Sequence, residues 1–148
     1  MNLDDFDAPK VGASWITDER DKVIEYLNRQ GVNHGGVPDE PAWFVAPFLA
    51  IWPVLSVNAP RTVAWWAVSG DVPTDYISSD GVADAREAMS EFSKRWLELS
   101  EYMLKGRPHP EIRIGTPDQW PELGDLLFRR ANLLAEFTAD EDNWKWQQ

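Results

Sequence analysis

The chain has 148 residues and contains no cysteine, and its 25 Asp and Glu against 14 Lys and Arg give a formal net charge of -11. This charge repels phosphate backbones and argues against nucleic-acid binding, which depends on cationic neutralisation. The lack of cysteine excludes disulfides, thiolate nucleophiles and cysteine-based zinc sites. Hydrophobic residues make up 43% of the sequence, so we expect one folded domain over residues 1–148.

The N-terminal segment, residues 1–13, is acidic and is expected to form a loose arm. It lacks the basic stretch and the apolar run of a signal peptide. The densest apolar segment, Trp43–Leu55, is interrupted by Pro47 and Pro53. It is shorter than the about 20 apolar residues that a membrane-spanning helix needs. We therefore expect a cytoplasmic protein with no membrane partner.

Apolar periodicity predicts three helices, over residues 15–30, 82–105 and 121–138. The second is the best defined, because apolar residues recur along it at alternating spacings of three and four. Ser79 or Asp80 can cap its start. The stripe comprises Val82, Ala85, Met89, Phe92, Trp96, Leu99 and Met103. It is expected to face the protein's own core, and the alternative is a seam between two copies in a homodimer.

The start of the third helix is open between two positions. Thr116–Gln119 matches a capping box, whereas Pro121 suits the first turn of a helix. In the second case Thr116–Gln119 forms a separate turn before the helix.

The middle of the chain predicts a sheet. Thr62–Val68 has strand composition without polar alternation, which is typical of a strand buried on both faces and places Trp65 and Trp66 in the core. Phe44–Val57 is either a partner strand or a helix interrupted by proline, and we favour antiparallel pairing with Thr62–Val68. Ile112–Ile114 can add a short edge strand. The predicted fold is α+β and mostly helical, with three main helices packed on a small antiparallel sheet.

The segment Ser69–Gly81 is the strongest candidate for chemistry, since it joins a buried strand to the long helix and polar groups converge at such positions. Asp71 and Asp75 could form a carboxylate pair, with Thr74 and Tyr76 beside them. The alternative, which we prefer, is structural: a turn, with Asp75 bonded to the backbone and Tyr76 packed inward.

The two histidines, His34 and His109, each lack a second histidine at helical spacing, so no metal site and no cofactor is predicted. His109 stands between two prolines and is expected in a solvated loop, yet it remains a candidate binding residue beside Asp71 and Asp75. The standard enzyme signatures are absent, so no catalytic residue is assigned.

The sequence contains nine Trp, most of which we expect in the core. The C-terminal tail, residues 140–148, is acidic and then aromatic. Its Trp144 and Trp146 either dock on the body of the protein or stay free for a partner, because Trp is enriched at binding hot spots.

The run Trp65–Ile77 follows the pattern W-W-x-V-S-G-D-x-P-T-D-Y-I. Together with Phe48–Trp52 and Trp120–Leu123, it resembles a small family of bacterial single-domain proteins described only as a domain of unknown function. The resemblance covers nearly the whole chain and implies a cytoplasmic protein with no assigned activity, so it supplies no catalytic residue. Pro53 departs from the smoother apolar run expected after Trp52.

Two classes of function follow. The favoured one is a non-enzymatic, protein-binding module of regulatory or immunity type, whose partner is basic. The alternative is a small-molecule-binding protein or enzyme that uses the loop with Asp71, Asp75 and Tyr76.

Overall fold

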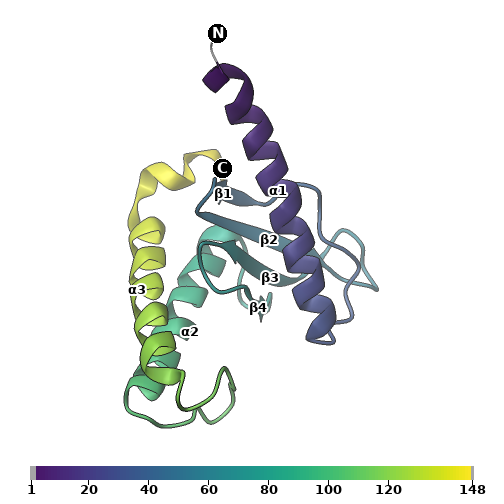
Figure 1. Cartoon of the computed structure of the whole chain (residues 1–148). Helices are drawn as coiled ribbons and strands as arrows, with labels where there is room; N and C mark the ends of the chain where they lie inside the picture. Colours follow the sequence, from purple (N-terminus) through teal and green to yellow (C-terminus); the bar gives the residue numbers. More distant parts are fainter. Residues whose placement is uncertain (1–2, 148) are drawn as a thin grey trace. The chain divides into compact units, whose positions relative to one another are not determined.

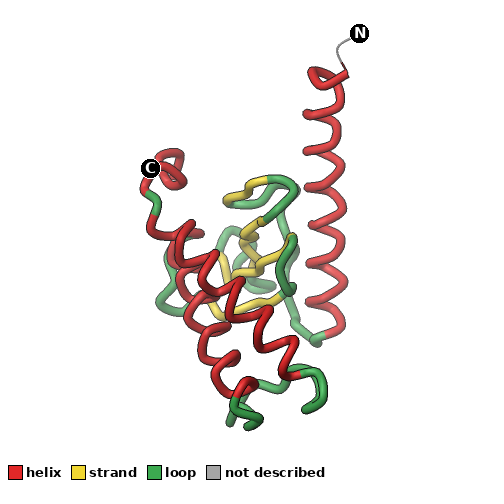
Figure 2. Tube along the Cα trace, turned by 60° about the vertical axis from the view of Figure 1, so that its left-hand side comes forward, coloured by secondary structure: helices red, strands yellow, loops and turns green. Residues whose placement is uncertain are grey.

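The computed structural model describes the backbone of residues 3–147 and the side chains of residues 13–145. Within that range it contains three α-helices, α1 (Leu3–Arg29), α2 (Ala85–Leu104) and α3 (Trp120–Ala139), and a four-stranded antiparallel sheet (Figures 1 and 2). A short 3-10 helix, η1 (Glu141–Gln147), follows α3. The predicted α+β class is confirmed. The chain divides into two compact units, Met1–Ala88 and Met89–Gln148.

The first unit holds the sheet, which runs β1 (Trp43–Val45), β2 (Leu49–Leu55), β3 (Val63–Gly70) and β4 (Asp75–Ser78), each antiparallel to the next. The predicted pairing between the 44–57 and 62–68 segments is confirmed as β2 with β3. The 44–57 segment is strand rather than helix, and it folds into a hairpin of its own, β1–β2. The fourth strand, β4, lies where the sequence indicated only a loop.

Pro53 fits inside β2 because its missing N–H costs the ladder nothing. The carbonyl of Ile51 accepts a hydrogen bond from Ala42, and Leu55 exchanges bonds with Gly35 and Gly36, so both residues turn their backbone groups away from β3. Alternation along an antiparallel strand directs the nitrogen of Pro53 the same way. The departure from a smooth apolar run therefore leaves the strand intact.

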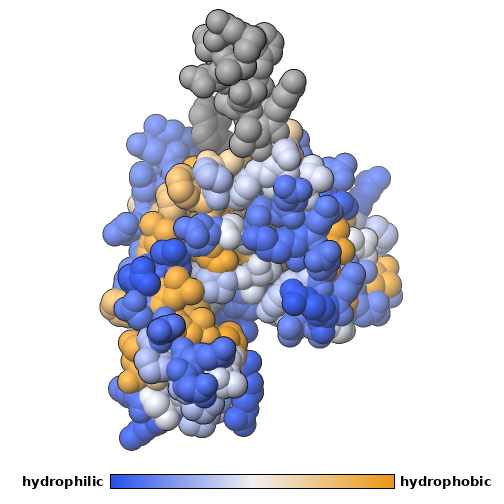
Figure 3. Space-filling model, in the orientation of Figure 1, coloured by the Kyte–Doolittle hydropathy of each residue, from blue (hydrophilic) through white to orange (hydrophobic). Residues whose placement is uncertain are grey.

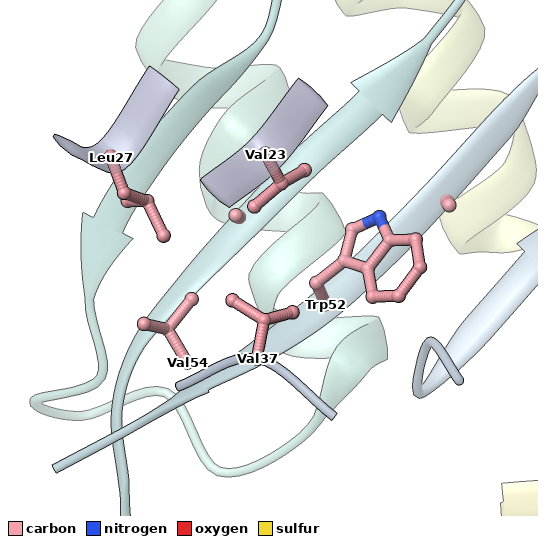
Figure 4. Packing of buried hydrophobic residues seen from close by; sticks show 7 residues of the cluster. Val23, Leu27, Val37, Trp52 and Val54 are labelled. Atoms are coloured by element: carbon pink, nitrogen blue, oxygen red, sulfur yellow. The ribbon is translucent and has the colours of Figure 1, made fainter. Parts of the chain in front are cut away.

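Helix α1 covers one face of this sheet (Figure 1). Val23 and Leu27 of α1 pack with Trp52 and Val54 of β2, and Val37 from the loop after α1 joins them (Figure 4). All five side chains are buried. The helix predicted over residues 15–30 is confirmed, and it ends at Arg29.

The expectation of a loose arm over residues 1–13 is wrong for residues 3–13, because α1 begins at Leu3. Residues 1–2 of that arm lie outside the described range. The backbone of α1 continues through Pro9 and Gly12.

The two central strands are buried on both faces. Trp52 and Ala67 lie on the α1 face, and Ile51 and Val68 lie on the opposite face, and all four are fully buried. The indole N–H of Trp52 donates a hydrogen bond to the hydroxyl of the buried Ser69, with 3.1 Å between the heavy atoms. The predicted strand is confirmed over Val63–Gly70, but complete burial holds only from Trp66 to Ser69, since Val63–Trp65 are half-buried and Thr62 is exposed.

In the second unit α2 and α3 pack side by side (Figures 1 and 2). The Ser93 hydroxyl donates to the carbonyl of Ala131 at 2.7 Å. Gly124 lies so close to α2 that a Cβ there would meet Met103 at 3.0 Å and Leu104 at 3.1 Å. Except for Val82, which is half-buried before α2, the predicted apolar stripe of the second helix is buried.

Helix α2 begins later than predicted, and its cap is a different residue. Asp84 accepts a hydrogen bond from the backbone N–H of Glu87, and the Glu87 carboxylate accepts one from Ala83. The arrangement resembles a capping box, except that Glu87 reaches the N–H of the residue before the cap, and it satisfies two N–H groups at the helix start. Ser79 and Asp80 instead belong to the turn after β4, where Ser79 donates to the carbonyl of Val63.

Helix α3 begins at Trp120, with Pro121 in its first turn. The Gln119 side chain accepts a hydrogen bond from the backbone N–H of Thr116, which closes a separate turn before the helix. Of the two possible starts, the second is therefore observed. Ile112–Ile114 forms no strand, so the predicted extra edge is wrong. Among the helices within residues 3–147, none is long and apolar enough to cross a membrane.

We predict that Trp66→Ala lowers the free energy of unfolding by about 3–5 kcal/mol, the usual cost of removing a buried large aromatic side chain. Trp66 is 5% exposed and its indole N–H donates to the carbonyl of Val82, whereas Trp65 is only half-buried. Trp65→Ala should therefore cost less. Urea denaturation followed by far-UV circular dichroism measures both values, and equal losses would contradict this assignment of the core.

Candidate functional site

The predicted carboxylate–tyrosine group does not converge. Asp71 is exposed in the connection after β3, and Thr74 is half-buried beside β4. Asp75 and Tyr76 are neighbours in β4, and successive residues of a strand point to opposite faces of the sheet. The ring of Tyr76 lies on the α1 face, 6.0 Å from the ring of Tyr26, while Asp75 is buried on the other face.

Asp75 has a structural contact that the sequence anticipated. Its carboxylate accepts a hydrogen bond from the backbone N–H of Tyr76 at 2.8 Å, and the side chain is only 4% exposed. This is the local side-chain-to-backbone bonding typical of aspartate at the edges of turns. Within the described residues, no group of three His, Asp or Glu side chains is arranged to hold a metal ion.

His109 belongs to the second unit and is buried, which corrects the expectation of a solvated loop residue. Its Nδ1 accepts hydrogen bonds from the backbone N–H groups of Glu111 and Ile112, both at 3.0 Å. A nitrogen that accepts two N–H groups carries no proton, so the proton of the neutral ring is on Nε2. Nε2 faces the carboxylate of Glu98 at 3.4 Å, and the ring of Tyr102 lies 4.9 Å away.

In this arrangement His109 stabilises the backbone of the loop and does not act as a base. The lone pair that could accept a proton is already used by two backbone donors, and the other ring nitrogen carries its own proton. Burial in a loop between two prolines could not be inferred from the sequence, because the neighbours of His109 come from α2.

A cavity of about 450 Å³ opens beside His109, entirely within the second unit. Its walls come from α2, from the loop over residues 106–117 and from the first residue of α3. They are mostly apolar and aromatic, and two guanidinium groups stand among them. The residues that matter most are Tyr102, Met103, Arg107, Ile112, Arg113 and Trp120.

The sequence did not predict this cavity, because its walls come from separate segments that only the fold brings together. Ile112, Ile114 and Trp120 were the available signal, since large apolar side chains in a short connection need a surface to pack on.

The hairpin β1–β2 presents a second feature that was missed. Phe44 is 45% exposed and Phe48 is 55% exposed, although both belong to the most apolar part of the sequence. The carbonyl of Phe48 accepts a hydrogen bond from the N–H of Asp71 at 2.8 Å, so the predicted candidate Asp71 lies directly beside this hairpin.

Apolar side chains also reach the surface of the second unit. In Figure 3 they gather over α3, at the left of the view. Phe128 of α3 is 45% exposed, the same fraction as Phe44. This similarity makes Phe128 a matched control for the hairpin.

The open question about the tail is resolved for Trp144. Its side chain is 4% exposed and its indole N–H donates to the carbonyl of Phe137 at 3.0 Å, so it is docked on α3. The side chain of Trp146 lies outside the described residues.

We predict that Gly70→Ala is more destabilising than Gly81→Ala. Both glycines have positive φ, +125° and +74°, but only at Gly70 would a Cβ collide with the backbone, at the carbonyl of Phe48. Gly81→Ala should cost about 1–2 kcal/mol for the unfavourable φ alone. Gly70→Ala should exceed it by at least about 1 kcal/mol because of the added overlap. Urea denaturation midpoints compare the two, and equal midpoints would contradict the close approach.

We predict that His109→Ala lowers the free energy of unfolding by about 1–3 kcal/mol, because it leaves two backbone N–H groups without their acceptor. His109→Asn should retain most of that stability, since its side-chain oxygen occupies a position similar to that of Nδ1. Amide hydrogen exchange at Glu111 and Ile112 gives the local measurement. The same acceleration of exchange in both variants would show that Nδ1 is not the acceptor that matters.

A comparison with family models finds one match, described as a domain of unknown function (DUF4826), over residues 10–144. No curated protein and no solved structure matches the chain. The match includes Trp65–Ile77 and the flanking segments that suggested a domain of unknown function, and it confirms that resemblance. Because the match covers most of the sequence, the chain belongs to the DUF4826 family.

Proposed function

We propose that the protein is a non-enzymatic binding module that recognises a basic protein through the hairpin surface, defined as Phe44, Phe48 and Asp71. The observation that carries the proposal is the exposure of two phenylalanines, 45% and 55%, on a hairpin of the acidic first unit. Large aromatic side chains presented at a surface are typical anchors of protein interfaces.

The hairpin surface is held in place by its backbone. The N–H of Phe48 donates to the carbonyl of Val45 at 2.8 Å, and the Phe48 carbonyl accepts from Asp71 at the same distance. The ring of Phe44 lies 6.5 Å from the ring of Trp15 on α1. An anchor that is already ordered loses less conformational entropy when a partner binds.

The charge of this unit favours a basic partner. Met1–Ala88 carries 14 acidic and 6 basic residues, whereas Met89–Gln148 carries 11 and 8. Asp71 stands next to Phe48, and the exposed Asp39 and Glu40 precede β1. A rim of negative charge around apolar anchors accelerates association with a positively charged surface and disfavours acidic proteins. Regulation or neutralisation of such a protein in the cytoplasm is the form of function that we propose.

The placement of the polar candidates favours binding over catalysis. Asp75 and Tyr76 point to opposite faces of the sheet, and the Nδ1 of His109 already accepts two backbone N–H groups. The proposal therefore gives Asp71 a role at the rim of an interface and gives no residue a catalytic role.

Site-specific photo-crosslinking tests the hairpin surface. A benzophenone amino acid replaces Phe48 in one variant and Phe128 in another, and each is expressed in cells of the source organism and irradiated. We expect the Phe48 variant to form an adduct with one basic protein in the cytoplasmic fraction. The Phe128 variant, whose natural side chain is 45% exposed against 55% for Phe48, should not form that adduct.

Affinity then measures the contribution of the anchor. The protein found in the adduct is purified and titrated against the unmodified chain, Phe48→Ser and Phe128→Ser. Loss of an aromatic hot spot should weaken binding by about thirtyfold or more for Phe48→Ser, while Phe128→Ser leaves it unchanged. An adduct from Phe128 alone would move the interface to α3, and an adduct with a second copy of this chain would replace the proposal by a homodimer.

A further inference from the structure

The cavity of the second unit has walls that are fixed by the protein's own hydrogen bonds. The indole N–H of Trp120 donates to the carbonyl of Ile114 at 3.1 Å. His109 holds the backbone of Ile112 through its Nδ1. Sites for small molecules are usually preformed in this way, and about 450 Å³ lies within their ordinary range of size, roughly 300–1,000 Å³.

Two cations stand at this apolar cavity. Arg107 and Arg113 both line it and both are exposed, and neither forms an ion pair with any carboxylate of the described residues. The chain has 25 Asp and Glu against 14 Lys and Arg, so carboxylates that could pair with an arginine are in excess. Two guanidinium groups without an ion pair beside an apolar cavity are therefore suited to an anion that comes from outside.

The residues that line the cavity restrict which class of anion it can bind. Tyr102, Met103 and Ile112 offer an apolar surface for the body of a ligand, and a guanidinium binds a carboxylate with two parallel hydrogen bonds. The carboxylate of Glu98 on α2 faces His109 at 3.4 Å, and Glu111 follows His109 in the loop beside the cavity. Their negative charge opposes a second charge on the ligand, which disfavours a phosphate dianion.

We propose that this cavity binds a small carboxylic acid with an apolar body, as a monoanion, with Arg107 and Arg113 pairing with the carboxylate. The site lies in the second unit and is independent of the hairpin surface. It can therefore exist whether or not the proposed partner does.

A matched set of probes tests the proposal on the full chain. 3-Phenylpropionate carries both the apolar body and the carboxylate, 3-phenylpropionamide lacks the charge, and propionate lacks the ring. The shift of the Trp120 indole N–H resonance follows each titration. We expect saturable binding of 3-phenylpropionate and at least about tenfold weaker binding of the other two probes, since each loses one of the two kinds of contact.

Arginine variants locate the charge. Arg107→Gln and Arg113→Gln should each weaken binding of 3-phenylpropionate by about tenfold. Arg61→Gln is the control, because Arg61 is also exposed and lies in the first unit. These surface changes should leave the unfolding midpoint unchanged, so loss of binding would not reflect loss of the fold.

Four outcomes would overturn the proposal. Equal affinity for the acid and the amide would show that the charge is not recognised. Equal weakening by Arg61→Gln would show a general effect of charge, and tighter binding of benzyl phosphate would show that the anion class is wrong. An unchanged Trp120 resonance with every probe at about 10 mM, where even weak complexes form, would show that the cavity is not such a site.

Discussion

The burial of β2 and β3 on both faces is the constraint on which the first unit depends. A strand that faces no solvent must satisfy its backbone polar groups within the sheet and leave no polar side chain unpaired. Trp52 meets this requirement through Ser69, which supplies the acceptor for its indole N–H. Helix α1 then completes one face by packing Val23 and Leu27 against the same tryptophan (Figure 4). The exposed hairpin can be rigid because its second strand belongs to this buried pair.

The long-range pattern of the sequence predicted much of the fold. The stripe from Ala85 to Met103 repeats at the spacing of a helix, and packing against one surface is enough to enforce that period. The strand around Trp66 was equally clear, since β-branched and aromatic residues are concentrated there without polar alternation. Both signals come from burial, which requires apolar residues at regular positions.

Local signals at the ends of elements were less informative. β4 has only four residues, begins with Asp75 and ends with Ser78, so it resembles a turn in composition. At the start of α2, Asp84 accepts from the N–H of Glu87 and the Glu87 carboxylate accepts from the N–H of Ala83, and Ser79 or Asp80 offered the same chemistry a few residues earlier. Ser79, Asp80 and Asp84 could each cap the helix, and tertiary contacts decide which one does.

The candidate sites show a different limit. Asp75 and Tyr76 are adjacent in sequence, but β4 sends them to opposite faces, so adjacency was misleading once a strand formed. His109 was identified as a candidate, yet its burial against Tyr102 depends on a contact between a loop and a helix that no short motif encodes. The cavity beside it has the same origin. Its walls come from three separate segments, and only the folded second unit brings them together.

The hydrogen bond between Trp52 and Ser69 also allows hydrogen exchange of the Trp52 indole to report the opening of the first unit. Trp52 and Ser69 are both fully buried, so the indole proton can be replaced by deuterium only when the first unit opens around it. The indole proton of Trp144 is held by a different unit, through the carbonyl of Phe137. Regions of one chain can open with different free energies. These two tryptophans therefore distinguish whether the two units of a DUF4826 protein open together or separately, without any added label.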